Sequence, residues 1–324
     1  MKTIIIGSGP AGYYCASKLM GPEESITLLD GEGVGFYSKI RLPDYVAGEI
    51  PREKIFLSLP NFLTDKGVEV KSGLKAISIN VDKKTLSAGE GGKELLPWDR
   101  LVLATGGTAF IPPVEGAAAK DILVLRSLED AEKLLARTGP KKQVLVMGGG
   151  LLGLEAAWAL IKRDCIVRVV EYFPNLLPRQ LSPEQGEEVK GSLEQRGFVF
   201  NLGQTLIRLE HSDSGKYTAS LSSGESLEVD AVLASAGVRP NCELAKKAGI
   251  AVHRGILVNE RLQTSVPNIF AIGDCAELAD GSIPGLWMAA SHQAEALCNI
   301  LKGKQDSYQI PMFTPKLKIA DISI

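Results

Sequence analysis

Residues 4–12 read Ile-Ile-Ile-Gly-Ser-Gly-Pro-Ala-Gly, which is an apolar strand that runs directly into a glycine turn and a helix. Gly7 permits the tight bend, Gly9 lets the backbone approach a ligand without a Cβ, and Gly12 lets the helix pack closely on its strand. The turn leaves backbone amide donors and the positive end of the helix directed at an anion. The segment therefore predicts a site for the pyrophosphate of a dinucleotide.

The glycine spacing alone is also compatible with a tight structural connection, so its context has to decide between the two interpretations. Residues 11–19 predict a helix, and residues 26–29 predict a second strand that ends at Asp30. An acid at that position is placed to accept hydrogen bonds from a ribose diol. The context favours a binding site.

The same arrangement occurs a second time in the chain. A predicted strand is followed by Gly148, Gly150 and Gly153, and the next strand ends at Glu171. The first glycine of the turn and the acid are each displaced by 141 positions from their counterparts in the first copy. Because a register shared by two motifs is hard to obtain by chance, the repeat predicts two dinucleotide sites.

A further correspondence extends the repeat to whole domains. Gly106 and Gly237 each follow an apolar strand that an aspartate precedes, and they lie 131 positions apart. Before that strand, each copy contains short alternating strands that indicate an antiparallel insert. The chain after residue 238 starts no third copy but predicts a strand at 269–272 and a helix at 287–301. The pattern predicts an α/β fold with parallel sheets and antiparallel inserts.

Composition argues against several classes of function. The net charge of -2 and the lack of a Lys/Arg run argue against binding to nucleic acid or to an anionic membrane. No stretch is long and apolar enough to span a bilayer, and the first strand begins at Thr3, so we expect no signal peptide and a cytoplasmic location. The five cysteines form no C-x-x-C or C-x4-C pair and the three histidines are isolated, so we expect neither a local redox dithiol nor a metal site.

The segment 36–43 reads Phe-Tyr-Ser-Lys-Ile-Arg-Leu-Pro and follows a glycine-rich loop after the first acid. Its cations, Lys39 and Arg41, are able to contact phosphates, and its aromatic residues are able to contact a ring. A solvated loop is equally consistent with the sequence, which does not choose between the two. Residues 61–65 predict a short helix.

Taken together, these segments resemble the FAD-dependent pyridine nucleotide-disulfide oxidoreductases with two dinucleotide-binding domains, over nearly the whole chain. Five motifs account for the resemblance: Gly-Ser-Gly-Pro-Ala-Gly at 7–12, Leu-Ala-Thr-Gly at 103–106, Gly-Gly-Gly-Leu-Leu-Gly-Leu-Glu at 148–155, Gly-Val-Arg-Pro-Asn at 237–241 and Thr-Ser-Val-Pro-Asn-Ile-Phe-Ala-Ile-Gly-Asp at 264–274. The resemblance implies two Rossmann-like, three-layer domains, with the NAD domain inserted into the FAD domain. The implied boundaries are an FAD-binding domain at 1–110 and 237–306, an NAD-binding domain at 111–236, and the beginning of a truncated or vestigial C-terminal α+β interface domain at 307–324.

The resemblance implies that the first copy binds FAD. The implied contacts are Gly7, Gly9, Pro10, Ala11, Gly12, Asp30, Lys39, Arg41, Ala76, Ala104, Thr105, Gly106, Arg126, Gly273, Asp274 and Met288. Among them, Asp30 would bind the adenosine ribose, Ala76 would lie near the adenine and Asp274 would hold the ribityl chain. Met288 would lie where the N-terminus of the last helix faces the flavin pyrimidine, so that the helix dipole stabilises negative charge there.

The second copy is implied to bind the nicotinamide dinucleotide. The implied contacts are Gly148, Gly150, Leu151, Leu152, Gly153, Glu155, Glu171 and, after the closing strand, Gly237. Glu155 would lie close to where nicotinamide meets flavin, and Lys39 and Glu155 are the implied catalytic residues. Glu171 accepts from a free 2′-hydroxyl and repels a 2′-phosphate, and residues 172–174 bring no cation, so we expect NADH to be preferred over NADPH.

The subgroup depends on segment 36–43. Peroxidase and oxidase members carry a reactive cysteine where Lys39 stands, whereas this segment is similar to that of rubredoxin reductases and of the flavin module of NADH-dependent nitrite reductases. Without a thiol relay, electrons must leave for a one-electron acceptor, so the resemblance implies a small electron-carrier protein, with rubredoxin favoured. The alternatives are a nitrite reductase flavin module and an NADH-sensing flavoprotein without rapid turnover, and a homodimer is compatible with each.

One position departs from the pattern of the relatives. Related ferredoxin reductases carry a lysine at the position of Asp44 that pairs with the glutamate matching Glu155. Here Lys39 or Arg41 would have to take its place.

Overall fold

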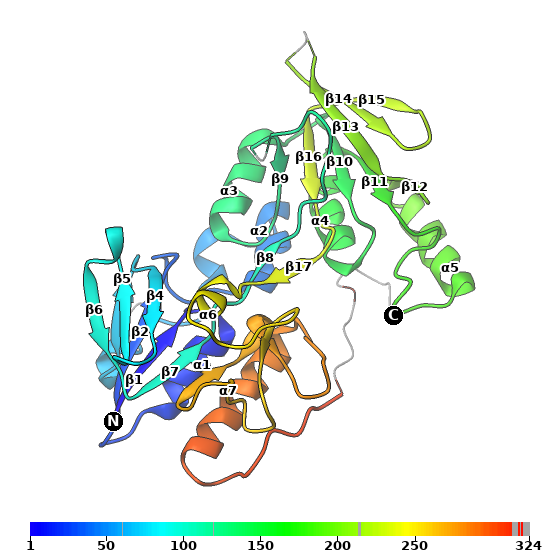
Figure 1. Ribbon diagram of the computed structural model, residues 1–324. Helices are drawn as coiled ribbons and strands as arrows, with labels where there is room; N and C mark the ends of the chain where they lie inside the picture. Colours follow the sequence, from blue (N-terminus) through cyan, green and yellow to red (C-terminus); the bar gives the residue numbers. More distant parts are fainter. Residues whose placement is uncertain (60, 119, 213–214, 313–316, 318, 320–324) are drawn as a thin grey trace. The chain divides into compact units, whose positions relative to one another are not determined.

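Two five-stranded parallel sheets organise the chain in this computed structural model, which describes residues 1–59, 61–118, 120–212, 215–312, 317 and 319 (Figure 1). Each sheet belongs to a separate unit. Unit 1 contains Met1–Tyr37, Phe56–Thr108 and Arg239–Thr314, and unit 2 contains Ser38–Ile55, Ala109–Val238 and Pro315–Ile324. Most of the expected beginning of a C-terminal domain, at 313–316, 318 and 320–324, lies outside the described residues.

The sheet of unit 1 has the order β19-β7-β1-β2-β3. Its strands are β1 (Lys2–Ile6), β2 (Ser25–Asp30), β3 (Glu69–Ser72), β7 (Arg100–Leu103) and β19 (Ile269–Ala271). Ile6 pairs with both Leu29 and Leu103, so the chain leaves three neighbouring strands at the same edge of the sheet. Helix α1 (Pro10–Leu19) packs against α7 (Trp287–Leu301).

The sheet of unit 2 repeats this plan, with the order β12-β11-β10-β16-β9. Its strands are β9 (Ile122–Leu123), β10 (Gln143–Met147), β11 (Ile166–Glu171), β12 (Val199–Leu202) and β16 (Ala231–Ala234). Met147 pairs with both Val170 and Ala234, as Ile6 pairs with two neighbours in unit 1. The fifth strand differs in origin: β9 precedes the repeated strands of its unit, whereas β19 comes from the end of the chain.

Smaller elements complete the two units. The antiparallel inserts are β4 (Ala76–Asn80), β5 (Thr85–Ala88) and β6 (Glu94–Pro97) in unit 1, and β13 (Leu206–His211), β14 (Tyr217–Leu221) and β15 (Ser226–Val229) in unit 2. Two-stranded sheets join β8 (Gly107–Ala109) to β17 (Val238–Pro240) and β18 (Ile256–Leu257) to β20 (Ala276–Glu277). The remaining helices are α2 (Leu42–Ala47), α3 (Leu128–Arg137), α4 (Leu151–Ile161), α5 (Pro183–Glu194) and α6 (Glu243–Lys247).

Individual hydrogen bonds confirm the repeat. The Lys2 amide donates to Asp99 Oδ2 at 2.7 Å in unit 1, and the Gln143 amide donates to Asp230 Oδ2 at 2.8 Å in unit 2. Each aspartate precedes the closing strand of its sheet and holds the start of the first strand. The periodic sequence therefore describes two copies of one fold.

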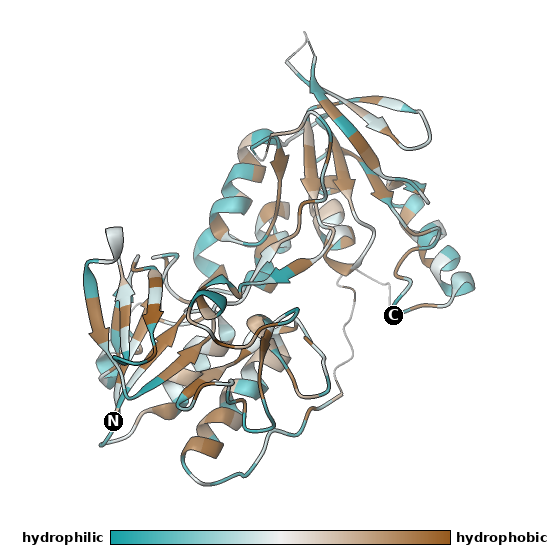
Figure 2. Ribbon diagram, in the orientation of Figure 1, coloured by the Kyte–Doolittle hydropathy of each residue, from teal (hydrophilic) through white to brown (hydrophobic). Residues whose placement is uncertain are grey.

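Burial of the central strands explains why their sequences are apolar throughout. Leu101, Val102 and Leu103 of β7 and Leu145 and Val146 of β10 are all fully buried. Figure 2 shows these strands coloured as hydrophobic, whereas α3 carries a hydrophilic face. Parallel strands covered by other structure on both faces require such continuous apolar runs.

Segment 36–43 is more ordered than a loop. A 3-10 turn at Lys39–Arg41 leads directly into α2, whose Leu42 and Val46 are buried. From Ser38 onward the segment belongs to unit 2, although it falls within the range 1–110 expected for the first domain. The helix expected at 61–65 is a 3-10 turn at Thr64–Lys66.

Membrane-spanning helices and metal-binding clusters are both absent from the described part of the chain. None of its helices combines the length and the apolar run that crossing a bilayer requires. No group of three or more His, Cys, Asp or Glu side chains among the same residues is arranged to hold a metal ion.

A buried carboxylate fixes the loop before β18 in unit 1. Glu277 is 3% exposed, and its Oε2 accepts from the amides of Arg254 and Gly255, both at 2.8 Å. His253 Nδ1 lies 2.9 Å from Oε1. Burial alone would raise the pKa of the Glu277 carboxyl, but His253 and the two amides outweigh it and hold that pKa below its ordinary value.

We expect Glu277→Gln to lower the free energy of unfolding by about 1.5–3 kcal/mol at pH 7, because it removes hydrogen bonds to a charged acceptor. A carboxylate with a lowered folded pKa stabilises the fold above its unfolded pKa of about 4.3, and this contribution is lost as the pH falls through the folded pKa. The difference from wild type, measured by urea unfolding, should therefore shrink as the pH falls below about 4. Glu188→Gln, at an exposed site on α5, is the control and should change neither the free energy of unfolding nor its dependence on pH. An equal loss at pH 3 and pH 7 would contradict the assignment.

Candidate functional site

The glycine turn of unit 1 is packed on its inner side and open on its outer side. Gly7 has φ +108°, and a Cβ there would lie 2.2 Å from the Ala104 carbonyl oxygen. A Cβ on Gly12 would lie 1.8 Å from the carbonyl oxygen of Gly7, whereas a Cβ on Gly9 would meet nothing within 4 Å. The turn is therefore a cradle whose open face only a glycine leaves free, as a pyrophosphate requires.

Unit 2 contains the same cradle. Gly148 has φ +115°, and a Cβ there would lie 2.5 Å from the Ser235 carbonyl oxygen. A Cβ on Gly153 would lie 2.1 Å from the carbonyl oxygen of Gly148, and a Cβ on Gly150 would meet nothing within 4 Å. The residues in both turns fit a dinucleotide.

An acid at the end of the second strand is tied to each turn. Asp30 accepts from Ser8 Oγ at 2.6 Å and from the Gly35 amide at 3.1 Å. Glu171 accepts from the Gly149 amide at 2.6 Å and from the Phe173 amide at 2.9 Å. Each carboxylate oxygen keeps a second lone pair, so both acids retain the capacity to accept from a ribose hydroxyl.

Other expected contacts of unit 1 lie at the same sheet edge. Thr105 Oγ1 donates to the Asn241 carbonyl, and Asn241 Nδ2 donates back to the Thr105 carbonyl, both at 2.8 Å. Gly273, with φ +79°, donates its amide to Gln293 Oε1 at 2.6 Å. Asp274 follows in the same turn.

Two of these partners, Asn241 and Gln293, were not nominated as site residues from the sequence. Gln293 is 1% exposed on α7, so a polar residue on the buried face of that predicted helix was the available signal. The other expected residues of unit 1 are Ala76, at the start of β4, and Met288, in the first turn of α7 and 62% exposed.

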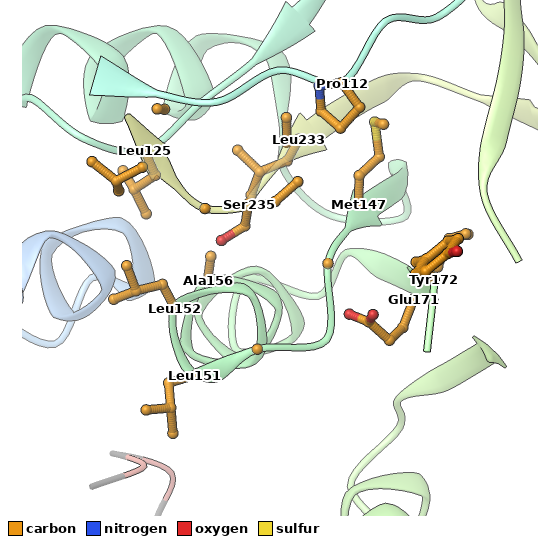
Figure 3. A pocket seen from close by; sticks show the side chains of 18 of the residues that line it. Pro112, Leu125, Met147, Leu151, Leu152, Ala156, Glu171, Tyr172, Leu233 and Ser235 are labelled. Carbon is orange, nitrogen blue, oxygen red and sulfur yellow. The ribbon is translucent and has the colours of Figure 1, made fainter. Parts of the chain in front are cut away.

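A cavity of about 670 Å³ surrounds the glycine turn of unit 2. The expected nucleotide contacts that line it are Gly148, Gly150, Leu151, Leu152, Glu155, Glu171 and Gly237. Figure 3 shows Glu171 and Tyr172 on one side of the turn and Leu152 and Leu125 on the other, with Met147 and Ser235 between them. Most of its lining is apolar, with a few convergent polar groups, which is typical of a cofactor site.

Three cations expected at the FAD belong to unit 2. Lys39 and Arg126 line the cavity together with Glu155. Arg41 instead donates Nη1 to the Lys54 carbonyl at 3.1 Å, and its Nε lies 3.5 Å from Asp44 Oδ2. The structure thus brings Lys39 and Glu155, the two expected catalytic residues, to one cavity.

Arg179 also lines the cavity and was missed from the sequence. Leu177, two residues before it, is fully buried with φ +52°, a conformation that a bulky side chain rarely adopts. The amides of Gln180 and Leu181 close the turn on the Leu177 carbonyl at 2.9 and 3.0 Å. Tyr172 and Phe173, which line the same cavity, bring no cation, but Arg179 places one in the cavity wall.

All five cysteines are free thiols. Burial raises the pKa of Cys165 and Cys275, and raises that of Cys242 to about 11, so these thiols stay protonated near neutral pH. Cys15 on α1 and Cys298 on α7 have their Sγ atoms 3.9 Å apart, a proximity that their sequence spacing did not indicate, and both are buried. Neither lies in segment 36–43, where a flavin-linked thiol relay would be expected.

Comparisons with known proteins agree with this geometry. The family model described as "Pyridine nucleotide-disulphide oxidoreductase" matches residues 1–294. The chain is 31% identical to a rubredoxin-NAD(+) reductase of Alcanivorax borkumensis over 93% of this chain and 78% of that protein. It is 30% identical to a nitrite reductase [NAD(P)H] of Bacillus subtilis over 100% of this chain and 40% of that protein.

The structure is also similar to a solved one, the covalent putidaredoxin reductase–putidaredoxin complex, with a TM-score of 0.89 and 31% identity over 95% of this chain and 76% of that chain. The chain spans less than half the length of its nitrite reductase relatives. With the family model matching most of its length, the chain belongs to the pyridine nucleotide-disulphide oxidoreductase family.

Proposed function

We propose that this chain is an NADH-dependent FAD oxidoreductase that delivers single electrons to a small electron-carrier protein, with rubredoxin as the leading candidate. Membership of the family supports FAD and NADH as the cofactors. The observation that carries the proposal is the repeated cradle, in which Gly9 and Gly150 leave the same face of the turn open.

The FAD is assigned to unit 1. The amides of the glycine turn hold the pyrophosphate, Asp30 accepts from the adenosine ribose, and Asp274 meets the ribityl hydroxyls. The N-terminus of α7, near Met288, is an electropositive helix end that suits a position where negative charge develops. When bound, FAD supplies the chemistry that converts a hydride donor into a source of single electrons.

The NADH is assigned to the cavity of unit 2. Glu171 accepts from the adenosine ribose, the amides around Gly150 hold the pyrophosphate, and the apolar wall excludes water from the nicotinamide half. Lys39 and Glu155, which line the same cavity, position that half for transfer. The protein thus binds and orients its cofactors, and no side chain is assigned a proton transfer.

The acceptor is inferred from the thiols. Segment 36–43 offers Lys39 where a reactive cysteine would stand, and burial raises the pKa of the Cys165 and Cys275 thiols. Electrons therefore have no thiol relay to follow and leave for a one-electron carrier. The rubredoxin reductase relative supports this acceptor, and the nitrite reductase relative supports a second candidate, the flavin module of such an enzyme.

Stopped-flow kinetics on the FAD-loaded protein test the acceptor. After reduction by NADH, we expect oxidised rubredoxin to reoxidise the flavin about as fast as it was reduced, and oxygen to do so far more slowly. A flavin that rubredoxin and ferredoxin leave reduced, and that persists in air, would point instead to an NADH sensor. Reoxidation only by a sirohaem protein would point to the nitrite reductase module.

The two glycines of the first turn give opposite expectations. Gly12→Ala places a Cβ against the Gly7 carbonyl, so unit 1 should unfold more easily. Gly9→Ala meets nothing in the protein, so its thermal unfolding without cofactor should match wild type while FAD retention, followed by flavin absorbance after gel filtration, falls. Full FAD retention in folded Gly9→Ala would contradict the assignment of this turn.

Glu171 is expected to set the preference for NADH. We expect wild type to use NADH with a kcat/KM at least about tenfold higher than NADPH, because the carboxylate repels a 2′-phosphate. Glu171→Gln should narrow this ratio, since Arg179 in the same cavity then meets the phosphate without competition. The double variant Glu171→Gln/Arg179→Gln is the matched control and should lose the gain with NADPH. A wild-type enzyme that favours NADPH would show the assignment to be wrong.

A further inference from the structure

The segment Ser38–Ile55, here termed the arm, belongs to unit 2 but is flanked in sequence on both sides by residues of unit 1. Its ends are joined by a hydrogen bond from the Ser38 amide to the Ile55 carbonyl at 2.8 Å. Leu42, Val46 and Ile55 are all at most 1% exposed, so the arm has its own buried side. It is therefore a folded element and not an exposed loop.

The arm is anchored on two helices of unit 2. Helix α2 of the arm packs against both α3 and α4. Glu49 Oε1 forms an ion pair with Lys162 Nζ at 2.6 Å, and Arg52 Nε lies 3.1 Å from Glu132 Oε1. The anchor residues on unit 2 thus follow their partners in the arm by 113 and 80 positions, respectively.

The first turn of the arm forms part of the cavity wall. Lys39, Ile40 and Pro43 line the cavity together with residues of α4. Figure 3 shows α2 in blue beside Leu152, on the side of the glycine turn away from Glu171. Because Glu171 is assigned to the adenosine ribose, the arm lies at the opposite, nicotinamide end of the site.

We infer that the arm is a positioning element for the nicotinamide half of the dinucleotide, and that the Glu49–Lys162 and Arg52–Glu132 ion pairs hold it in place. This inference rests on the proposed function of the cavity. The ion pairs are partly exposed, so each adds little to global stability. Their effect is local, because a small shift of a wall that contacts the reacting ring changes how the ring is held.

The test compares two ligands on the FAD-loaded protein by isothermal titration calorimetry: NAD⁺, which has both halves, and ADP-ribose, which lacks nicotinamide. Glu49→Lys replaces the attraction to Lys162 with repulsion. We expect the Kd for NAD⁺ to rise about fivefold and the Kd for ADP-ribose to stay within about twofold of wild type. The charge swap Glu49→Lys/Lys162→Glu should restore NAD⁺ binding.

The second anchor gives an independent pair of variants, Arg52→Glu and Arg52→Glu/Glu132→Arg, with the same expected loss and recovery. Lys133→Glu breaks an exposed ion pair with Glu129 on α3 that does not involve the arm, so it is the matched control and should leave both Kd values unchanged. Thermal unfolding of each variant reports whether unit 2 stays folded.

The role of the arm and the function of the cavity can fail separately in these measurements. Equal weakening of NAD⁺ and ADP-ribose, or unchanged NAD⁺ binding in both single variants, would overturn the role of the arm. Loss without recovery in both charge swaps would overturn the role of the ion pairs. A wild-type protein that binds neither ligand would instead overturn the proposed function of the cavity.

Discussion

The close approach of a helix to the strand before it is the constraint on which both units depend. At Gly12 and Gly153 a Cβ would fall within about 2 Å of a carbonyl oxygen of the same turn, so only hydrogen fits there. This contact aims the helix N-terminus at the space above the sheet edge. The acids bond to this turn, and the closing strands pair with the strand that leads into it.

The central parallel strands could be predicted because burial on both faces demands continuous apolar runs, and because the repeat places each strand at a constant offset. Helix α7 could be predicted to its ends for a similar reason, since its 15 residues carry a sustained apolar pattern. Helix α2 could not. Its six residues are too few for a periodic signal, and it is stabilised by packing on α3 and α4, which lie far along the chain.

The candidate site residues that the sequence predicted have local patterns, whereas those that were missed depend mainly on contacts between distant parts of the chain. Asp30 and Glu171 end strands, and a strand end can be located from local sequence. Gln293 offers only a weak local signal, a polar residue on the buried face of α7, because its partner Gly273 lies on another element. Arg179 offers none, because only the folded turn brings it to the wall of the cavity. For Arg179 the difficulty is greatest, because the turn that presents it depends on a leucine in a left-handed conformation, where glycine or asparagine would be the expected signal.

The two cradles hold their acids by different donors, a side-chain hydroxyl in unit 1 and a backbone amide in unit 2. Ser8 and Gly149 occupy equivalent places in the two turns, 141 positions apart. In unit 1 the shorter Asp30 is reached by the Ser8 hydroxyl, whereas in unit 2 the longer Glu171 reaches the Gly149 amide itself.

A Cβ at position 149 would lie 2.9 Å from Leu176 Cδ2 and 3.2 Å from Glu171 Cβ, so the packing of this turn favours the glycine. The length of the acid and the identity of the turn residue are thus coupled through one hydrogen bond. The two turns therefore share a backbone but are not interchangeable, because each acid is held by the donor that the second residue of its own turn supplies.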